Sequence, residues 1–318
     1  MRRGGGGRKN YNRRAVALLD RAIARTLPVI PKPIVRRLSD RYIAGSELAE
    51  AIDTVRGLNA EGKKATLDVL GEEVETADEA LAIRAEYEEA MDAIESERLD
   101  ANVSVKPTAL GLKVDPDLCV DNVRALVLKA DEHGRFLRMD MEDSTTTTAT
   151  LDLYRRLRSE GHDNVGIVLQ AMLRRTHDDV LALAELAPNV RVCKGIYVEP
   201  PELAYQGDEA IRFNFVEAMS TLWANGAKVA VATHDDALVD KALGLIEGRG
   251  LGRERYEFQL LLGVREELAD ELVRGGHTVR IYVPYGRKWY EYSLRRLQEN
   301  PKVAGYIARD TLRRLRPR

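Results

Sequence analysis

Beyond residue 62 the chain alternates between two patterns of hydrophobic and polar positions. Short segments place an aliphatic residue at every second position, the period of a half-buried β-strand, and longer segments place apolar residues three or four apart, the period of a helix. Strands are predicted at residues 65–70, 103–106, 136–142, 165–170, 190–194, 228–234, 256–262 and 279–283. Helices are predicted between and after them, at residues 77–98, 116–132, 147–160, 178–187, 208–225, 236–248, 265–274 and 287–299.

These eight strand–helix pairs predict an α/β fold in which the strands close into a (β/α)8 TIM-like barrel. An open doubly wound sheet is the alternative, but eight regular units within about 240 residues fit closure better. No glycine-rich dinucleotide-binding loop follows the first strand. The glycines at 248, 250 and 252 lie in a later loop and have the wrong spacing for one.

The first 62 residues differ from the rest and predict a basic helical arm. Apolar residues recur at helical spacing among arginines from residue 11 to residue 27, and prolines then end the helix. Further helices are predicted at 34–43 and 47–58, the latter with Ser46 as its N-cap. The predicted domains are the arm at residues 1–62, the barrel at 63–300 and a basic C-terminal tail at 301–318.

Charge is distributed unevenly along the chain, although its formal net value is only -2. Residues 1–41 hold twelve lysines and arginines against two acidic residues, and residues 300–318 hold six against one. The middle of the chain must therefore be acidic, which argues against a nucleic-acid-binding protein with one broad basic face. The basic ends could contact an anionic membrane surface, or the basic first helix could simply pack on the body.

The reactive and metal-binding residue types are sparse. Cys119 and Cys193 are the only cysteines, which excludes a disulfide framework and a cysteine zinc site and fits a reducing compartment. The five histidines lack the spacing of a metal site, so no metal is expected. Neither a signal peptide nor an apolar run of about 20 residues is visible. We therefore expect a cytoplasmic protein, with peripheral contact at the inner face of the membrane left open.

The two sides of the predicted strands differ in polarity. The aliphatic side should face the helices, and the other side should face the barrel interior. Barrel interiors are ordinarily filled by branched aliphatic residues, and an unpaired buried ion costs several kcal/mol or more. A polar ligand site is therefore predicted from the inward residues, which are Asp68, Lys106, Arg138, Asp140, Glu142, Gln170, Arg191, His234, Glu257, Gln259, Arg280 and Tyr282.

The stretch from residue 279 to residue 299 predicts an anion-binding site. A strand ends there, Pro284 and Gly286 break the pattern, and a helix with adjacent Arg295 and Arg296 follows. Arginine can grip a carboxylate through two parallel hydrogen bonds, whereas the alternative is a solvated helix face. Asp140 would orient one arginine or balance its charge. Further cations are expected at the same strand ends, namely Lys106, Arg191 and Lys194.

Seven segments of the chain resemble the proline dehydrogenases, flavin enzymes that oxidise L-proline to Δ1-pyrroline-5-carboxylate. Each segment alone is a weak signal, and together they are specific. They occur in the order of that family and cover the whole barrel: VSVKPTALGL at 103–112, RMDMEDS at 138–144, VGIVLQAMLRRT at 165–176, VRVCKGIYVEP at 190–200, VATHD at 231–235, EFQLLLGV at 257–264, and RIYVPYG with WYEYSLRRLQE between 280 and 299.

The resemblance implies a distorted (β/α)8 barrel with FAD at the C-terminal ends of the strands. It implies that Lys106, Arg295 and Arg296 bind the proline carboxylate and that Leu261 and Tyr282 pack on the proline ring. Hydride would then pass from the proline ring to the flavin, and a membrane quinone would accept the electrons.

The resemblance also implies the residues around the flavin. Asp140 would hold the arginine cluster and Arg191 would lie beside the flavin, which makes these two the candidate catalytic residues. The residues implied to contact FAD are Met141, Gln170, Arg191, Lys194, Gly195, Ile196, Thr233, His234 and Glu299.

Two other classes of protein stay open at this point. A Schiff-base aldolase could use Lys106 or Lys194 as its nucleophile. A non-catalytic barrel could bind anionic lipid head groups through the basic ends of the chain. The absorbance spectrum of the purified protein separates these classes from a flavoprotein.

Overall fold

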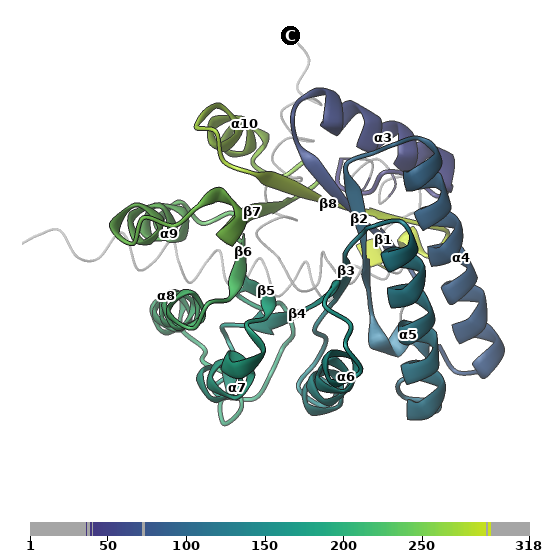
Figure 1. Ribbon diagram of the computed structural model, residues 1–318, viewed down its shortest axis with the longest axis horizontal. Coiled ribbons are helices and arrows are strands. Elements are labelled where there is room, and N and C mark those ends of the chain that lie inside the picture. The colour runs from purple at the N-terminus through teal and green to yellow at the C-terminus, as the bar shows by residue number, and fades with distance from the viewer. Residues whose placement is uncertain (1–35, 37–38, 40, 72–73, 291, 294–318) are drawn as a thin grey trace, which may run out of the picture. The chain divides into compact units, whose positions relative to one another are not determined.

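The computed structural model describes residues 36, 39, 41–71, 74–290 and 292–293. Eight parallel strands form a closed barrel in which each strand pairs with the next and the last pairs with the first, as the sequence predicted (Figure 1). The strands are β1 Lys64–Val69, β2 Ala101–Val105, β3 Leu137–Met139, β4 Val165–Gln170, β5 Asn189–Cys193, β6 Lys228–Ala232, β7 Tyr256–Leu261 and β8 Val279–Tyr285.

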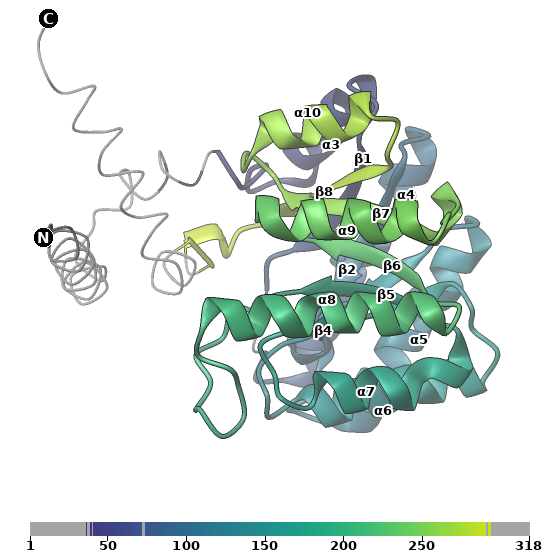
Figure 2. The ribbon, with the colours of Figure 1, turned by 90° about the vertical axis from the view of Figure 1, so that its left-hand side faces the viewer.

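A helix follows each of the first seven strands and lies on the outside of the barrel (Figure 1). Figure 2 shows three of these helices, α8, α9 and α10, in succession along one side. Short 3-10 helices, η2 Pro107–Leu110, η3 Ala184–Leu186 and η4 Arg253–Arg255, complete the connections. The α-helices are α4 Ala77–Ser96, α5 Pro116–Glu132, α6 Thr147–Ser159, α7 Thr176–Leu183, α8 Asp208–Ala224, α9 Asp236–Gly248 and α10 Glu266–Arg274.

Capping side chains define where several of these helices begin. The Thr76 hydroxyl accepts from the Glu79 N–H at 3.2 Å, and the Glu79 carboxylate accepts from the Thr76 N–H at 3.3 Å, which starts α4 with a capping box. Asp115 and Asp235 accept from the first N–H groups of α5 and α9. Each of these caps satisfies N–H groups that have no partner inside the helix.

The helix α3, Leu48–Ala60, precedes the barrel and packs on it. Its buried residues Ala51, Ile52 and Val55 belong to the same hydrophobic core as the strands. Its N-cap is Glu47 and not Ser46, because the Glu50 carboxylate turns back to accept the N–H groups of both residues. The compact unit that contains the barrel runs from Tyr42 to Arg287 and so includes α3.

The third strand is shorter than its hydrophobic pattern predicted. The pattern covers residues 136–142, but the ladder with β4 involves only Leu137–Met139. The side chains that follow are engaged in other contacts: Asp140 bonds across the interior, and Glu142 accepts from the N–H and hydroxyl of Thr108. The alternation therefore continues beyond the residues that pair with β4.

The second compact unit contains the described residues of the two ends of the chain. Within it, the hydroxyl of Ser39 donates to that of Ser293 at 2.6 Å, and the Arg36 guanidinium lies 4.9 Å from the ring centre of Trp289. Most of the predicted helix at 287–299 lies outside the described residues, as do the predicted helix at 11–27 and the tail at 301–318.

Candidate active site

The barrel separates the two sides of each strand in the way that the alternating pattern predicted. Aliphatic residues such as Leu67, Val103 and Val105 are buried in the core that the strands share with the helices. The alternate residues point into the barrel, where Asp68, Arg138, Asp140, Arg191 and Glu257 are also buried. A barrel interior with this many charges must pair them, because each buried ion has lost its hydration.

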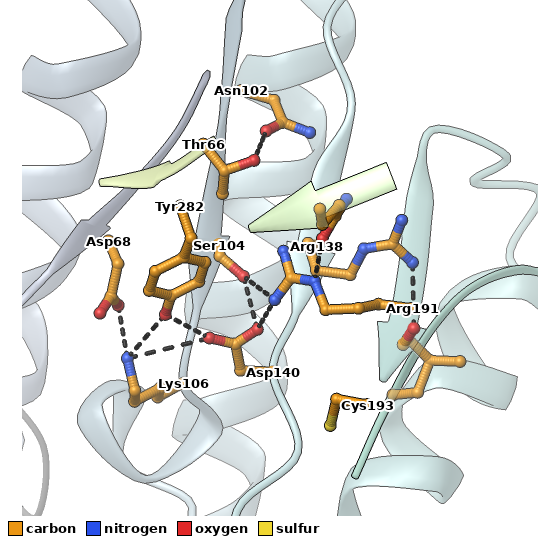
Figure 3. Close-up of polar contacts among 12 residues, drawn as sticks. Thr66, Asp68, Asn102, Ser104, Lys106, Arg138, Asp140, Arg191, Cys193 and Tyr282 are labelled. Atoms are coloured by element: carbon orange, nitrogen blue, oxygen red, sulfur yellow. Dashed lines mark hydrogen bonds and ion pairs between the residues drawn. The ribbon is translucent and has the colours of Figure 1, made fainter. Parts of the chain in front are cut away.

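Asp140 lies immediately after β3 and accepts three hydrogen bonds from three other strands. Its Oδ1 accepts from Arg191 Nη1 at 2.5 Å and from the Ser104 hydroxyl at 2.6 Å. Its Oδ2 accepts from the Tyr282 hydroxyl at 2.7 Å. Figure 3 shows these side chains converging on the carboxylate. The Arg191 guanidinium also lies 5.2 Å from the ring centre of Tyr282.

Lys106 continues this network toward β1. Its Nζ lies 2.5 Å from Asp68 Oδ1, 3.3 Å from the Tyr282 hydroxyl and 3.8 Å from Asp140 Oδ2 (Figure 3). The other oxygen of Asp68, Oδ2, is fully buried and has no hydrogen-bond partner among the described residues. We call Asp68, Ser104, Lys106, Asp140, Arg191 and Tyr282 the Asp140 cluster.

The pKa values of the two carboxyl groups of the cluster shift in opposite directions. Burial raises the pKa of Asp68, and the attraction of Lys106 only partly offsets this. Burial would also raise the pKa of Asp140, but the charges of Arg191 and Lys106 outweigh it and the pKa is lowered. Burial disfavours the charge on Lys106, yet Asp68, Tyr282 and Asp140 together outweigh it and the lysine pKa lies well above its ordinary value. The cluster therefore keeps Asp140 ionised and Lys106 positively charged.

A further buried arginine lies on β3, two residues before Asp140. Arg138 donates to the carbonyls of Ile167 and Asn189 and to the side chain of Asn189, at 3.0, 2.6 and 2.6 Å. Burial lowers the pKa of Arg138 to about 9, and the positive charge of Arg191 adds to this effect. Gly166 makes room for it, because a Cβ there would lie 2.5 Å from Arg138 Nη1 and 2.6 Å from the Asn189 carbonyl.

The loops after β5 and β6 carry a second group of predicted residues. Lys194 follows β5, and its Nζ lies 2.5 Å from Asp235 Oδ2, which also accepts from Arg212 at 2.7 Å. Burial alone would raise the pKa of Asp235, but Lys194 and Arg212 lower it. His234 Nε2 accepts from the Leu261 N–H at 3.0 Å, so a neutral His234 carries its proton on Nδ1.

The remaining predicted residues lie on or beside the C-terminal ends of strands. Gln170 ends β4 and donates to the Glu142 carbonyl at 2.6 Å, and Thr233 follows β6 and is buried. Gly195 has a φ of 96°, in the left-handed region that favours glycine. Met141 is buried, whereas Ile196 is 43% exposed.

The structure therefore brings Lys106, Asp140, Arg191 and Tyr282 together in one network and places Lys194 in a separate ion pair with Asp235. Arg295, Arg296 and Glu299 lie outside the described residues.

Three residues at the site were not singled out from the sequence. Ser104 and Tyr87 support the Asp140 cluster: the Tyr87 hydroxyl donates to the Ser104 carbonyl at 2.8 Å and lies 3.4 Å from Asp68 Oδ1. Asp235 pairs with Lys194. Asp235 had a detectable signal, because it stands at the N-cap of a predicted helix, but Ser104 and Tyr87 had none beyond their place in a strand and on an apolar helix face.

Comparison with known proteins agrees with the geometry. The proline dehydrogenase family model matches residues 51–309. The chain is 34% identical to a proline dehydrogenase of Deinococcus radiodurans over 280 residues, which covers 87% of this chain and 90% of that protein. It is 35% identical to proline dehydrogenase 2 of Bacillus subtilis over 266 residues, covering 84% and 88% of the two chains.

A solved structure extends the comparison to the fold. The crystal structure of proline utilization A from Bdellovibrio bacteriovorus, inactivated by N-propargylglycine, superimposes with a TM-score of 0.77 at 25% identity. The match covers 83% of this chain but only 33% of that longer one. The barrel, the order of the matching segments and the near full-length relatives lead to one conclusion: this chain belongs to the proline dehydrogenase family.

Proposed function

We propose that this protein oxidises L-proline to Δ1-pyrroline-5-carboxylate with bound FAD and that a membrane quinone then accepts the electrons. The observation that carries the proposal is the Asp140 cluster at the C-terminal ends of the strands, in a chain of the proline dehydrogenase family. Lys106 there is kept positively charged by Asp68, which suits it to bind a carboxylate.

The donors around the barrel mouth fit a flavin nucleotide. FAD carries a pyrophosphate and a ring edged with hydrogen-bond acceptors, so it requires cations and N–H donors. Lys194 is only partly buried after β5, and Arg191 has a nitrogen, Nη2, without an acceptor among the described residues. We propose that Arg191 and Lys194 contact FAD, together with Met141, Gln170, Gly195, Ile196, Thr233, His234 and Glu299.

The residues of this chain have four tasks in the proposed reaction. Lys106, with Arg295 and Arg296, binds the substrate carboxylate, and Leu261 and Tyr282 position the ring. Asp140 holds Arg191 and Tyr282 in place, and the buried cluster excludes water from the reacting atoms. FAD, when bound, supplies the two-electron acceptor that no side chain of the protein can provide.

The aldolase alternative in which Lys106 is the nucleophile is disfavoured by the raised pKa of this lysine. A Schiff-base lysine must lose its proton to attack a carbonyl, which requires a lowered pKa. Lys106 shows the opposite shift, because Asp68 lies 2.5 Å from its Nζ. This lysine is therefore equipped to bind an anion and not to act as a nucleophile.

An absorbance spectrum of the purified protein tests the proposal. We expect the two visible bands of an oxidised flavin, released as FAD on denaturation, and loss of the longer-wavelength band when L-proline is added without oxygen. D-proline and L-pipecolate serve as controls for handedness and ring size. A protein that takes up no flavin on incubation with FAD, or a flavin that L-proline leaves oxidised, would contradict the proposal.

A further inference from the structure

A chain of hydrogen bonds crosses the barrel interior from β8 to β5. Arg280 Nε donates to Glu257 Oε1 at 2.9 Å, and Gln259 Nε2 donates to the same oxygen at 2.5 Å. Arg191 Nε then donates to Gln259 Oε1 at 2.5 Å. Glu257, Gln259 and Arg191 are each 6% exposed, so water cannot readily replace these contacts.

Small side chains on β6 make this crossing possible. Glu257 and Gln259 are two residues apart on β7 and therefore face the same side. The strand between β7 and β5 pairs Ala230 with Arg191 and Ala232 with Gln259. Because alanine extends only one carbon into the interior, the Gln259 amide can pass over β6 and reach the arginine.

Glu257 decides which way the Gln259 amide points. An ionised carboxylate accepts hydrogen bonds and cannot donate one, so it selects the NH2 end of the amide. Burial would raise the pKa of Glu257, but the charge and hydrogen bonds of Arg280 lower it to about 2. The amide oxygen must then face Arg191, which is the only orientation that satisfies both neighbours.

We propose that Gln259, oriented by Glu257, is a positioning residue for proline oxidation, because it fixes the orientation in which Arg191 holds Asp140 and meets the bound cofactor. The inference rests on the proposed function. Three acceptors hold the guanidinium: Gln259 accepts from Nε, and Asp140 and, at 3.3 Å, the Ser104 hydroxyl accept from Nη1. Without Gln259, the guanidinium can rotate away from Asp140.

Gln259→Met tests this, because methionine has a similar length and none of the hydrogen bonds. We expect the Kd for FAD, measured by fluorescence titration of the apoprotein, to rise about 10-fold and kcat/KM for L-proline to fall about 10-fold. Arg191→Met should show changes at least as large, and the double variant should be no worse than Arg191→Met alone, since Gln259 then has no guanidinium left to position. Gln259→Asn, whose amide is too short to reach Arg191, replaces Gln259→Met in the cycle if the latter does not fold.

Asn122→Leu is the matched control. The Asn122 amide is also fully buried and also lies between an arginine and an acceptor, with Arg84 Nη1 at 3.3 Å and the Leu110 carbonyl at 3.1 Å. It lies on α5, and its hydrogen bonds involve Arg84 and Leu110 and not Arg191. We expect Asn122→Leu to lower the Tm while leaving the Kd for FAD within about 2-fold of wild type, as for a group with only a structural role.

Each result has a definite meaning. If the Gln259 variants lower only the Tm, as Asn122→Leu should, or if their effects multiply with that of Arg191→Met, the positioning role is wrong while the proposed function stands. If the wild-type protein neither binds FAD nor is reduced by L-proline, the proposed function fails, and the positioning role fails with it.

Discussion

The Asp140 carboxylate forms both ion pairs and hydrogen bonds inside the barrel. It accepts from Arg191, Ser104 and Tyr282, and Lys106 lies 3.8 Å away. A buried ion pair stabilises a fold only while both partners are present, because removing one leaves the other charge buried and uncompensated. Single residues of this cluster should therefore affect stability and activity together.

We expect Asp140→Asn to lower the free energy of unfolding by about 3–5 kcal/mol, because Arg191 loses its buried counter-ion. It should also lower kcat/KM for L-proline at least ~10-fold. Urea unfolding and steady-state kinetics measure the two effects. Asp92→Asn is the control: Asp92 pairs with Lys129 on the surface, and its loss should change stability by less than about 1 kcal/mol. Equal effects of the two substitutions would contradict the role given to the cluster.

Glu257 should make stability depend on pH in the acid range. Its folded pKa of about 2 lies below the ordinary glutamate value of about 4.3, so its contribution is present above that value and is lost as the pH falls toward 2. The shift corresponds to about 3 kcal/mol. Chemical unfolding between pH 6 and pH 2.5 should therefore show a smaller loss of stability in Glu257→Gln than in wild type.

Glu160 provides the surface comparison for this experiment. Arg124 lowers the pKa of its exposed carboxyl to about 2 as well. Salt should screen that surface pair and leave the buried one almost unaffected. In 0.5 M salt (about 4–5 Å screening length) the Glu160→Gln protein should match wild type across the range, whereas Glu257→Gln should still differ. A Glu257→Gln protein with the pH dependence of wild type would show that this carboxyl is not held ionised.

Glycine has different roles in a strand and in a helix of this protein. Gly166 on β4 lies under Arg138 and against the Asn189 carbonyl, where a Cβ would approach to 2.5 and 2.6 Å. Gly244 in α9 has nothing within 4 Å of the same position. The strand glycine therefore provides space for a buried arginine, while the helix glycine only adds conformational freedom to the unfolded chain.

The two glycines should respond to alanine in opposite directions. Gly166→Ala should lower the free energy of unfolding by about 1–3 kcal/mol through overpacking. Gly244→Ala should raise it by about 0.5–1 kcal/mol, because alanine favours the helix. The prediction is tested by comparing the urea midpoints of the two variants with that of wild type at one pH and temperature. If Gly166→Ala leaves the free energy of unfolding unchanged, Arg138 can move away from Gly166 without loss of stability.

On the scale of the whole molecule, the closed barrel leaves no free strand edge and gathers the eight C-terminal strand ends at one face. No described helix is both long enough and apolar enough to cross a membrane. The proposed electron transfer to a membrane quinone would need contact with the membrane surface. The sequence places twelve basic and two acidic residues within residues 1–41.

We expect the full-length protein to sediment with anionic vesicles and to stay in solution with neutral ones. Each basic residue near an anionic surface contributes about 1 kcal/mol, and added salt should release the protein. Replacing Arg13 and Arg14 by glutamine should weaken the binding, whereas replacing Arg155 and Arg156 of α6 should not. If equal amounts of protein stay in the supernatant with both kinds of vesicle, whatever the salt concentration, the basic arm has only a packing role.

The barrel and its polar interior could be predicted from the sequence, because the pattern that indicates them lies within each strand. The side-chain period of a strand is two, so the alternation of residues such as Leu137, Arg138, Met139 and Asp140 assigns each to the helix side or the interior without any tertiary information. Eight such segments separated by helical patterns then predict the count of strands, and parallel pairing places their C-terminal ends together.

The partners of those interior side chains were decided only by the tertiary structure. Closure and register determine which strands face each other, and so they determine that Gln259 reaches Arg191 across the alanines of β6 and that Lys194 pairs with Asp235. The opposite pKa shifts of Asp68 and Asp140 followed from the same distances, because the two side chains are chemically identical and differ only in their buried neighbours. A local period assigns a side chain to a face, whereas hydrogen bonds and pKa values depend on separations of a few ångströms that exist only once the barrel has closed.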